Sequence, residues 1–174
     1  ERQALTDILG ALALRIDHIG STSVPGLGAK DVIDIQVTAA ELSPDIVRRM
    51  TTASYTYTAD YHRDHAPLGE DESPHLWRKQ FFNQPEGRRR VNIHVRLAGN
   101  PNQRYALLFR DYLRAHPNSV RTIELIKREI AKRHADDLDV GEGGRGPAQM
   151  IDGEVGLGSA VGAPGLQVAG QAGQ

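Results

Sequence analysis

A short loop near the N-terminus collects side chains able to bind an anion. Residues 18–27 read HIGSTSVPGL, so three hydroxyl side chains follow a glycine and precede a Pro-Gly pair. Hydroxyls, backbone N–H groups and a nearby lysine together can hold a phosphate oxygen. The same hydroxyls can instead cap a turn by bonding their own backbone. The phosphate-binding candidates here are Gly20, Ser21, Thr22, Ser23 and Lys30.

Two common phosphate-binding motifs are absent from this loop. A Walker A motif needs a lysine directly after its second glycine, whereas Gly26 is followed by Leu27. The stretch that starts at Gly26 also fails the G-x-G-x-x-G pattern, because its sixth position is Asp31. Anion binding by this loop would therefore need an arrangement of donor groups other than these two motifs.

Two segments with alternating polarity lie further along the chain. Residues 31–37 read DVIDIQV and residues 91–97 read VNIHVRL, and both patterns predict strands. Each strand directs its aliphatic side chains to one face and its polar side chains to the other. The polar face gathers Asp34, Gln36, Asn92, His94 and Arg96. This face is either the solvated side of a sheet or one wall of a cleft. The loop at 18–27 favours the cleft, because it leads into the strand that carries Asp34.

Further strands and helices must position these residues. Periodicity and turn signals predict strands near 14–19, 54–58, 76–82 and 89–97, and helices near 2–12, after Ser43, at 101–115 and from 120 to about 136. Amphipathic helices can cover the apolar face of the sheet. In the helix at 101–115, an apolar stripe is expected to face the core; its residues are Tyr105, Leu108, Phe109, Tyr112 and Leu113. Without strict alternation of strands and helices, the expected fold class is α+β, a short mixed sheet with helices packed mainly on one face.

The composition indicates one water-soluble domain followed by a tail. The chain has 174 residues, a net charge of −1 and no cysteine, which excludes disulfides and cysteine-bound zinc and fits a cytoplasmic protein. The sequence indicates no membrane span and no signal peptide, and the charge balance does not call for a nucleic-acid partner. Residues 1–140 are expected to fold, and the glycine-rich residues 141–174 to form a flexible tail.

Two smaller features have alternative interpretations. Histidines flank Asp64 in the stretch YHRDH, which could ligate a metal, but a polar surface loop is favoured. Trp77, the only tryptophan, could stack on a base, but a core position is favoured.

Three separated motifs together resemble the GrpB family. They are HIGSTSVPGL…AKDVIDIQV, then VNIHVR, then YALLFRDYLRAHP, and they occur in the order of that family. The resemblance covers about residues 14–116. It implies a divergent nucleotidyltransferase-like fold, found in bacteria both alone and fused behind dephospho-CoA kinase.

The resemblance also implies roles for individual residues. In the nucleotidyltransferase superfamily, a Gly-Ser loop precedes a strand with two carboxylates, a third carboxylate comes from a later strand, and together they hold two divalent ions. Gly20 and Ser21 match the loop, and Asp34 matches the first carboxylate. Gln36 stands where the second carboxylate is expected, and His94 lies on a strand of the kind that supplies the third. The implied catalytic residues are Asp34 and His94. The implied ligands of a divalent ion, Mg²⁺ or Mn²⁺, are Asp34, His18 and His94, and the implied nucleotide contacts include Gln36 and Arg96.

Three functions remain open at this point. A nucleotide-binding module without turnover is favoured by Gln36, because an amide carries no charge for a metal pair. The first alternative is an active metal-dependent nucleotidyl or phosphoryl transferase, so whether the protein is an enzyme stays undecided. The second is a structural or folding partner of a dephospho-CoA kinase domain, as the fusion suggests.

Overall fold

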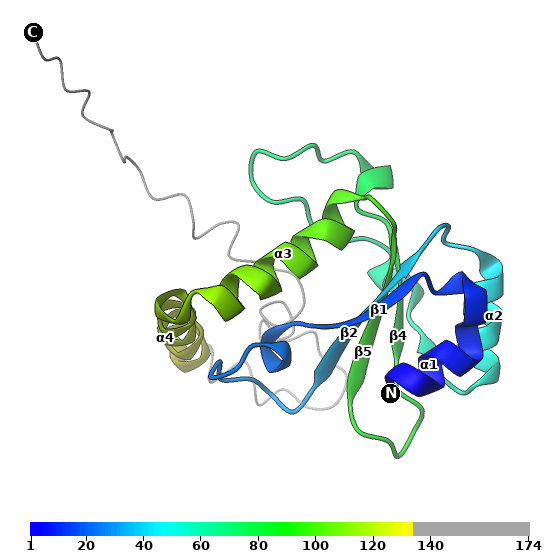
Figure 1. The fold of residues 1–174 in the computed structure, drawn as a ribbon, viewed down its shortest axis with the longest axis horizontal. Coiled ribbons are helices and arrows are strands. Elements are labelled where there is room, and N and C mark those ends of the chain that lie inside the picture. Colours follow the sequence, from blue (N-terminus) through cyan, green and yellow to red (C-terminus); the bar gives the residue numbers. More distant parts are fainter. Residues whose placement is uncertain (134–174) are drawn as a thin grey trace, which may run out of the picture.

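The structure is a computed structural model that describes residues 1–133. The predicted tail at 141–174 and the end of the predicted domain at 1–140 lie outside these residues. Within the described part, five strands form one mixed sheet in the order β1-β2-β5-β4-β3 (Figure 1). They are β1 (Arg15–Ile19), β2 (Ile33–Ala39), β3 (Thr56–Tyr57), β4 (Lys79–Asn83) and β5 (Val91–Leu97). The central pair β2–β5 is parallel, and the other three pairs are antiparallel.

Three α-helices lie on the two faces of this sheet, and a fourth, α4, packs against α3 (Figure 1). They are α1 (Arg2–Leu9), α2 (Pro44–Thr52), α3 (Pro101–Ala115) and α4 (Pro117–Arg133). Figure 1 shows α1 and α2 on one side of the sheet and α3 on the other. This mixed sheet with packed helices confirms the predicted α+β class. In residues 1–133, no helix combines the length and apolar character that a bilayer crossing requires.

The main core lies between the sheet and helices α1 and α2. Its fully buried side chains include Leu5, Leu9, Ile46, Met50, Val37, Phe82, Ile93 and Val95. The aliphatic positions predicted on β2 and β5 belong to this core except Leu97 at the end of β5, so the predicted alternation of these strands is confirmed over Ile33–Val37 and Val91–Val95. Trp77 is also buried, as expected, and its indole N–H donates to the carbonyl of Asp71.

Helix α3 turns a polar side toward the sheet. The helix begins at Pro101 after Asn100, as predicted, although the Asn100 amide donates to the His75 carbonyl rather than capping the helix. Its buried side chains are Asn102, Gln103, Arg110 and Leu113. In the predicted core stripe, by contrast, the exposed fractions are 39% for Tyr105, 69% for Leu108 and 50% for Tyr112. The prediction that these three face the core is wrong, because the sheet face under α3 is polar.

Two residues of the stripe are packed as predicted. Leu113 is buried in a second, smaller apolar cluster with Val24, Val120 and Ile123, and half-buried Phe109 packs against this cluster. This cluster joins the loop after β1 to both C-terminal helices. Residues of α3 and α4 are therefore held against the same loop that carries the hydroxyl side chains.

Candidate functional site

The loop after β1 passes directly over Asp34 because Gly20 has no side chain. The backbone of Gly20 has φ 69° and ψ −173°, a conformation that is essentially restricted to glycine. A Cβ atom placed there would lie 2.4 Å from Oδ2 of Asp34. The structure therefore brings together the loop glycine and the β2 carboxylate that the sequence suggested as neighbours.

The three loop hydroxyls do not share one role. Residues Ser21–Ser23 form a single 3₁₀ turn, in which the Ser23 hydroxyl donates to the Gly20 carbonyl at 2.6 Å. Ser23 is buried and thus serves the turn itself. The Thr22 hydroxyl lies 2.9 Å from Nε2 of His18. Ser21 and Thr22 are only half-buried, so they are the two hydroxyls that a ligand could reach.

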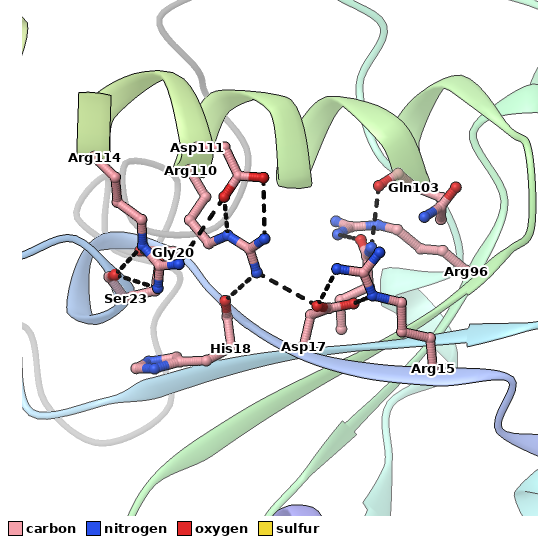
Figure 2. Close-up of polar contacts among 11 residues, drawn as sticks. Arg15, Asp17, His18, Gly20, Ser23, Arg96, Gln103, Arg110, Asp111 and Arg114 are labelled. Atoms are coloured by element: carbon pink, nitrogen blue, oxygen red, sulfur yellow. Dashed lines mark hydrogen bonds and ion pairs between the residues drawn. The ribbon is translucent and has the colours of Figure 1, made fainter. Parts of the chain in front are cut away.

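Two arginines of α3 hold this loop by its backbone (Figure 2). Arg114 donates from Nε and Nη2 to the carbonyl of Ser23, at 2.9 and 2.8 Å. Arg110 donates to the carbonyl of His18 at 3.1 Å and lies 3.5 Å from the carboxylate of Asp17. Burial, together with the charges of Arg114 and Arg110, lowers the pKa of His18. Both guanidinium groups also lie within 4 Å of the carboxylate of Asp111.

A lysine of α4 reaches the same loop. The Nζ atom of Lys127 donates to the Ser21 hydroxyl at 2.7 Å, and this lysine is half-buried. The sequence analysis missed Lys127, since 106 residues separate it from Ser21. The packing of α4 against the loop brings Lys127 to Ser21. In the sequence, a lysine on the fourth turn of an amphipathic helix is only a weak signal for a binding residue. Lys30, the cation predicted for this site, is exposed.

Asp34 faces an asparagine across the parallel strand pair. The strand register places Asp34 opposite Asn92 and Gln36 opposite His94. The Asn92 amide donates to Oδ1 of Asp34 at 3.0 Å, whereas Nε2 of His94 lies 3.8 Å from that oxygen. Asn92 is thus the nearer partner of the carboxylate, a role the sequence analysis did not assign to it.

Gln36 and Arg96 are used inside the fold. Gln36 is fully buried, accepts a hydrogen bond from Nη1 of Arg96 at 2.9 Å, and donates to the carbonyl of Gln103 on α3. Arg96 is also buried, and its Nε donates to Asp64 at 2.7 Å. These two predicted nucleotide contacts therefore bind each other and the helix above them.

Asp64 is the anion at the centre of this buried group. It lies 2.7 Å from Nζ of Lys79 and accepts a hydrogen bond from the Asn102 amide at 3.0 Å. The predicted surface loop is correct for His62 and His65, which are exposed, but wrong for Asp64. Burial and the Arg96 guanidinium lower the pKa of Lys79 to about 6, and the carboxylate of Asp34 opposes that shift.

The residues present do not fit the divalent-metal site that the resemblance implies. Within residues 1–133, no three His, Asp or Glu side chains are grouped so as to hold a metal. His18 contacts Thr22 instead of joining Asp34. The neighbouring carboxylate on this buried face, Asp64, is engaged by Lys79 and Arg96.

His94 is held as a neutral ring. Its Nδ1 lies 3.4 Å from Nη2 of Arg96, and because a guanidinium can only donate, the ring hydrogen is on Nε2. Burial, Arg96 and Lys79 lower the pKa of His94 well below its ordinary value. Folding therefore releases a proton from His94 when the pH is near or below 6.5.

This protonation difference predicts a loss of stability in mild acid. Because the unfolded chain binds a proton that buried His94 excludes, His94 should make the free energy of unfolding fall as the pH decreases below about 6.5. In His94→Gln, urea unfolding between pH 7 and 5 should show a shallower fall than in the wild type. The matched variant at exposed His65, His65→Gln, should keep the wild-type slope; equal slopes in all three proteins would contradict the assignment.

Comparisons with known proteins agree with this architecture. The profile described as GrpB protein matches residues 1–142. The chain is 36% identical over 144 residues to a protein named dephospho-CoA kinase from Mycolicibacterium paratuberculosis, covering 75% of this chain and 35% of that protein. It is 33% identical to the UPF0157 protein YqkA of Bacillus subtilis, covering 80% of this chain and 37% of that one. The chain thus spans little more than a third of the length of these relatives.

A solved structure shows the same fold. The crystal structure of conserved protein GrpB from Enterococcus faecalis matches with a TM-score of 0.60 and 29% identity, covering 79% of this chain and 78% of that one. The residues that match the GrpB profile, 1–142, include the sheet, the loop after β1 and both helices α3 and α4. The chain belongs to the GrpB family.

Proposed function

We propose that the loop at residues 20–23 and Lys127 bind the phosphate of a nucleotide-like small molecule. The observation that carries this proposal is the contact of 2.7 Å between Nζ of Lys127 and the hydroxyl of Ser21. A lysine and a hydroxyl held together at a half-buried position offer several donors to one anion.

The surroundings of the loop support an anion rather than a cation as ligand. Arg110 and Arg114 bind backbone carbonyls of the loop, so they fix its shape and bring two guanidinium groups to it. His18 lies beside Thr22, and burial followed by the charges of Arg114 and Arg110 lowers its pKa. A phosphate, with several oxygens that each accept hydrogen bonds, uses such a donor set well.

The polar face of the sheet behind the loop agrees better with ligand binding alone than with phosphoryl transfer. A two-metal phosphoryl transfer needs carboxylates around the ions. Here the second carboxylate position is Gln36, and its amide is engaged by Arg96 and Gln103. We therefore propose a binding or regulatory module whose anion is held by protein donors alone. The word kinase in the names of its relatives describes those longer proteins.

The proposal is tested by calorimetric titration of ATP, CTP, GTP and coenzyme A precursors. We expect Lys127→Met to weaken binding of the preferred ligand by about 10- to 100-fold, because a charge-assisted hydrogen bond is lost. Ser21→Ala should weaken it by about tenfold while the free energy of unfolding stays within about 1 kcal/mol. Chelation of divalent ions should leave the affinity for a coenzyme A precursor unchanged.

Lys132→Met provides the matched control for this experiment. Lys132 lies on the same helix as Lys127 but is exposed and pairs with Glu129. Its replacement should leave the affinity as in the wild type. Failure of every phosphate-bearing compound to bind the wild type, or an equal loss in both lysine variants, would overturn the proposal.

A further inference from the structure

A chain of side-chain hydrogen bonds runs from Thr58, the residue after β3, across β4 and β5 to β2. The Thr58 hydroxyl donates to Oδ1 of Asn83 at 3.3 Å, and Nδ2 of Asn83 donates to Oδ1 of Asn92 at 3.1 Å. Nδ2 of Asn92 then donates to Oδ1 of Asp34 at 3.0 Å. Every donor in this chain points toward the carboxylate. We name Thr58, Asn83 and Asn92 the amide row.

The amide row has hydrogen-bonding capacity beyond this chain. An asparagine amide nitrogen carries two hydrogens. Within residues 1–133, these hydrogen bonds use one amide hydrogen of Asn83 and one of Asn92. Asn83 and Asn92 are both half-buried, unlike Gln36 and Arg96 further along the same face, which are buried. The amide row is therefore more accessible to solvent than the buried end of this face under α3.

Aromatic rings lie next to the amide row. Phe81 is on the same strand and the same face as Asn83, two residues away. Its ring contacts His94 edge-on at 5.0 Å and Tyr61 at 5.3 Å. Phe81 is half-buried, and Tyr61 is 39% exposed. A flat ring and paired amide groups together are what proteins use to stack a nucleobase and read its edge.

The row is continuous with the phosphate-binding loop. Gly20 lies against Asp34, and Asp34 binds Asn92. From Asp34 to Asn83 the sheet extends by two strand spacings, about 10 Å. A nucleotide likewise presents its phosphates and its base at opposite ends of one extended molecule.

We infer that the amide row and the Phe81–Tyr61 rings form a base-recognising subsite, and that the ligand is a nucleoside phosphate. This inference rests on the proposed function of the loop, because it assigns a phosphate to one end of the site and a base to the other. Asn83 would offer its free amide hydrogen to an acceptor on the base edge, with Tyr61 stacking on the ring.

The test compares three classes of compound on the same protein. Titrations with the four ribonucleoside triphosphates, with inorganic tripolyphosphate and with the unphosphorylated nucleosides separate the base from the phosphates. We expect one triphosphate to bind at least about tenfold more tightly than tripolyphosphate. Asn83→Ala should remove most of that preference and leave the affinity for tripolyphosphate unchanged. Asn118→Ala, at an exposed asparagine of α4, is the control and should behave as the wild type.

The possible outcomes distinguish a failure of the base-recognising subsite from a failure of the phosphate-binding loop. If tripolyphosphate binds as tightly as every nucleotide, the inference is wrong while the proposed function stands. If nucleosides bind as tightly as nucleotides and tripolyphosphate does not bind, the subsite is supported and the loop proposal is wrong. If none of the compounds binds, both are wrong. Should Asn83→Ala lower the unfolding temperature markedly, Tyr61→Ala provides the second variant, which should likewise lose the base preference alone.

Discussion

Replacing Asp64 by alanine should lower the free energy of unfolding by about 3–5 kcal/mol, because the variant leaves buried positive charge without a counter-ion. Asp64 accepts from Arg96 and Asn102 and lies 2.7 Å from the Lys79 ammonium, and both cations are buried. Lys79 can lose its proton in the variant, but the Arg96 guanidinium cannot. Urea unfolding followed by circular dichroism measures the loss.

Two further variants separate charge from shape at this position. Asp64→Asn keeps the volume of the side chain but removes its charge, so its cost should approach that of the alanine variant. Asp60→Ala changes an exposed carboxylate in the same part of the chain and should stay within about 0.5 kcal/mol of the wild type. A cost below about 1 kcal/mol for Asp64→Ala would show that the buried ion pairs contribute little.

Substituting Gly20 by alanine is expected to destabilise the protein by about 2–5 kcal/mol. Two separate effects contribute: a backbone conformation that only glycine adopts readily, and a Cβ atom 2.4 Å from Oδ2 of Asp34. Because the loop would have to move away from Asp34, ligand binding should be lost as well. Thermal and urea unfolding, with a binding titration of the folded fraction, provide the measurements.

Gly26→Ala is the control that isolates the contact. Gly26 also has a positive φ, 77°, but among residues 1–133 no atom beyond its chain neighbours lies within 4 Å of a Cβ placed there. This variant should show only the backbone cost, about 1–3 kcal/mol, and should retain ligand binding. Equal destabilisation in the two glycine variants would mean that the approach of Gly20 to Asp34 has no energetic consequence.

Local patterns in the sequence were sufficient to predict most of the fold. Alternation along residues 91–97 correctly separates the core side chains from the polar side chains, because strand periodicity does not depend on the partner strand. The helix starts at Pro44 and Pro101 were also predictable, since proline is favoured in the first turn.

The orientation of α3 was not predictable from its apolar stripe. Hydrophobic periodicity assumes that a helix packs on an apolar surface, whereas α3 packs on the polar face through Gln103 and Arg110. Tyr105 and Leu108 are consequently exposed, and Phe109 is less buried than a core residue would be.

The candidate site was predictable only in part. The loop glycine and Asp34 are close in sequence, so their proximity could be inferred from a resemblance and a turn. Lys127 and Asp64 owe their places to contacts with residues 106 and 32 positions away, respectively. Neither residue lies in a local pattern that distinguishes it from an ordinary surface charge.

The parallel pairing of β2 with β5 also affects how the chain is made. Asp34 on β2 pairs with Asn92 on β5. After Asp34 is made, the ribosome must therefore add 58 residues before its partner exists. At a translation rate of about 5–20 residues per second, that interval lasts about 3–12 s. During it, β2 has one open edge of backbone donors and acceptors that can pair with another nascent chain. Slower elongation over residues 40–90 would lengthen this period and favour aggregation during synthesis.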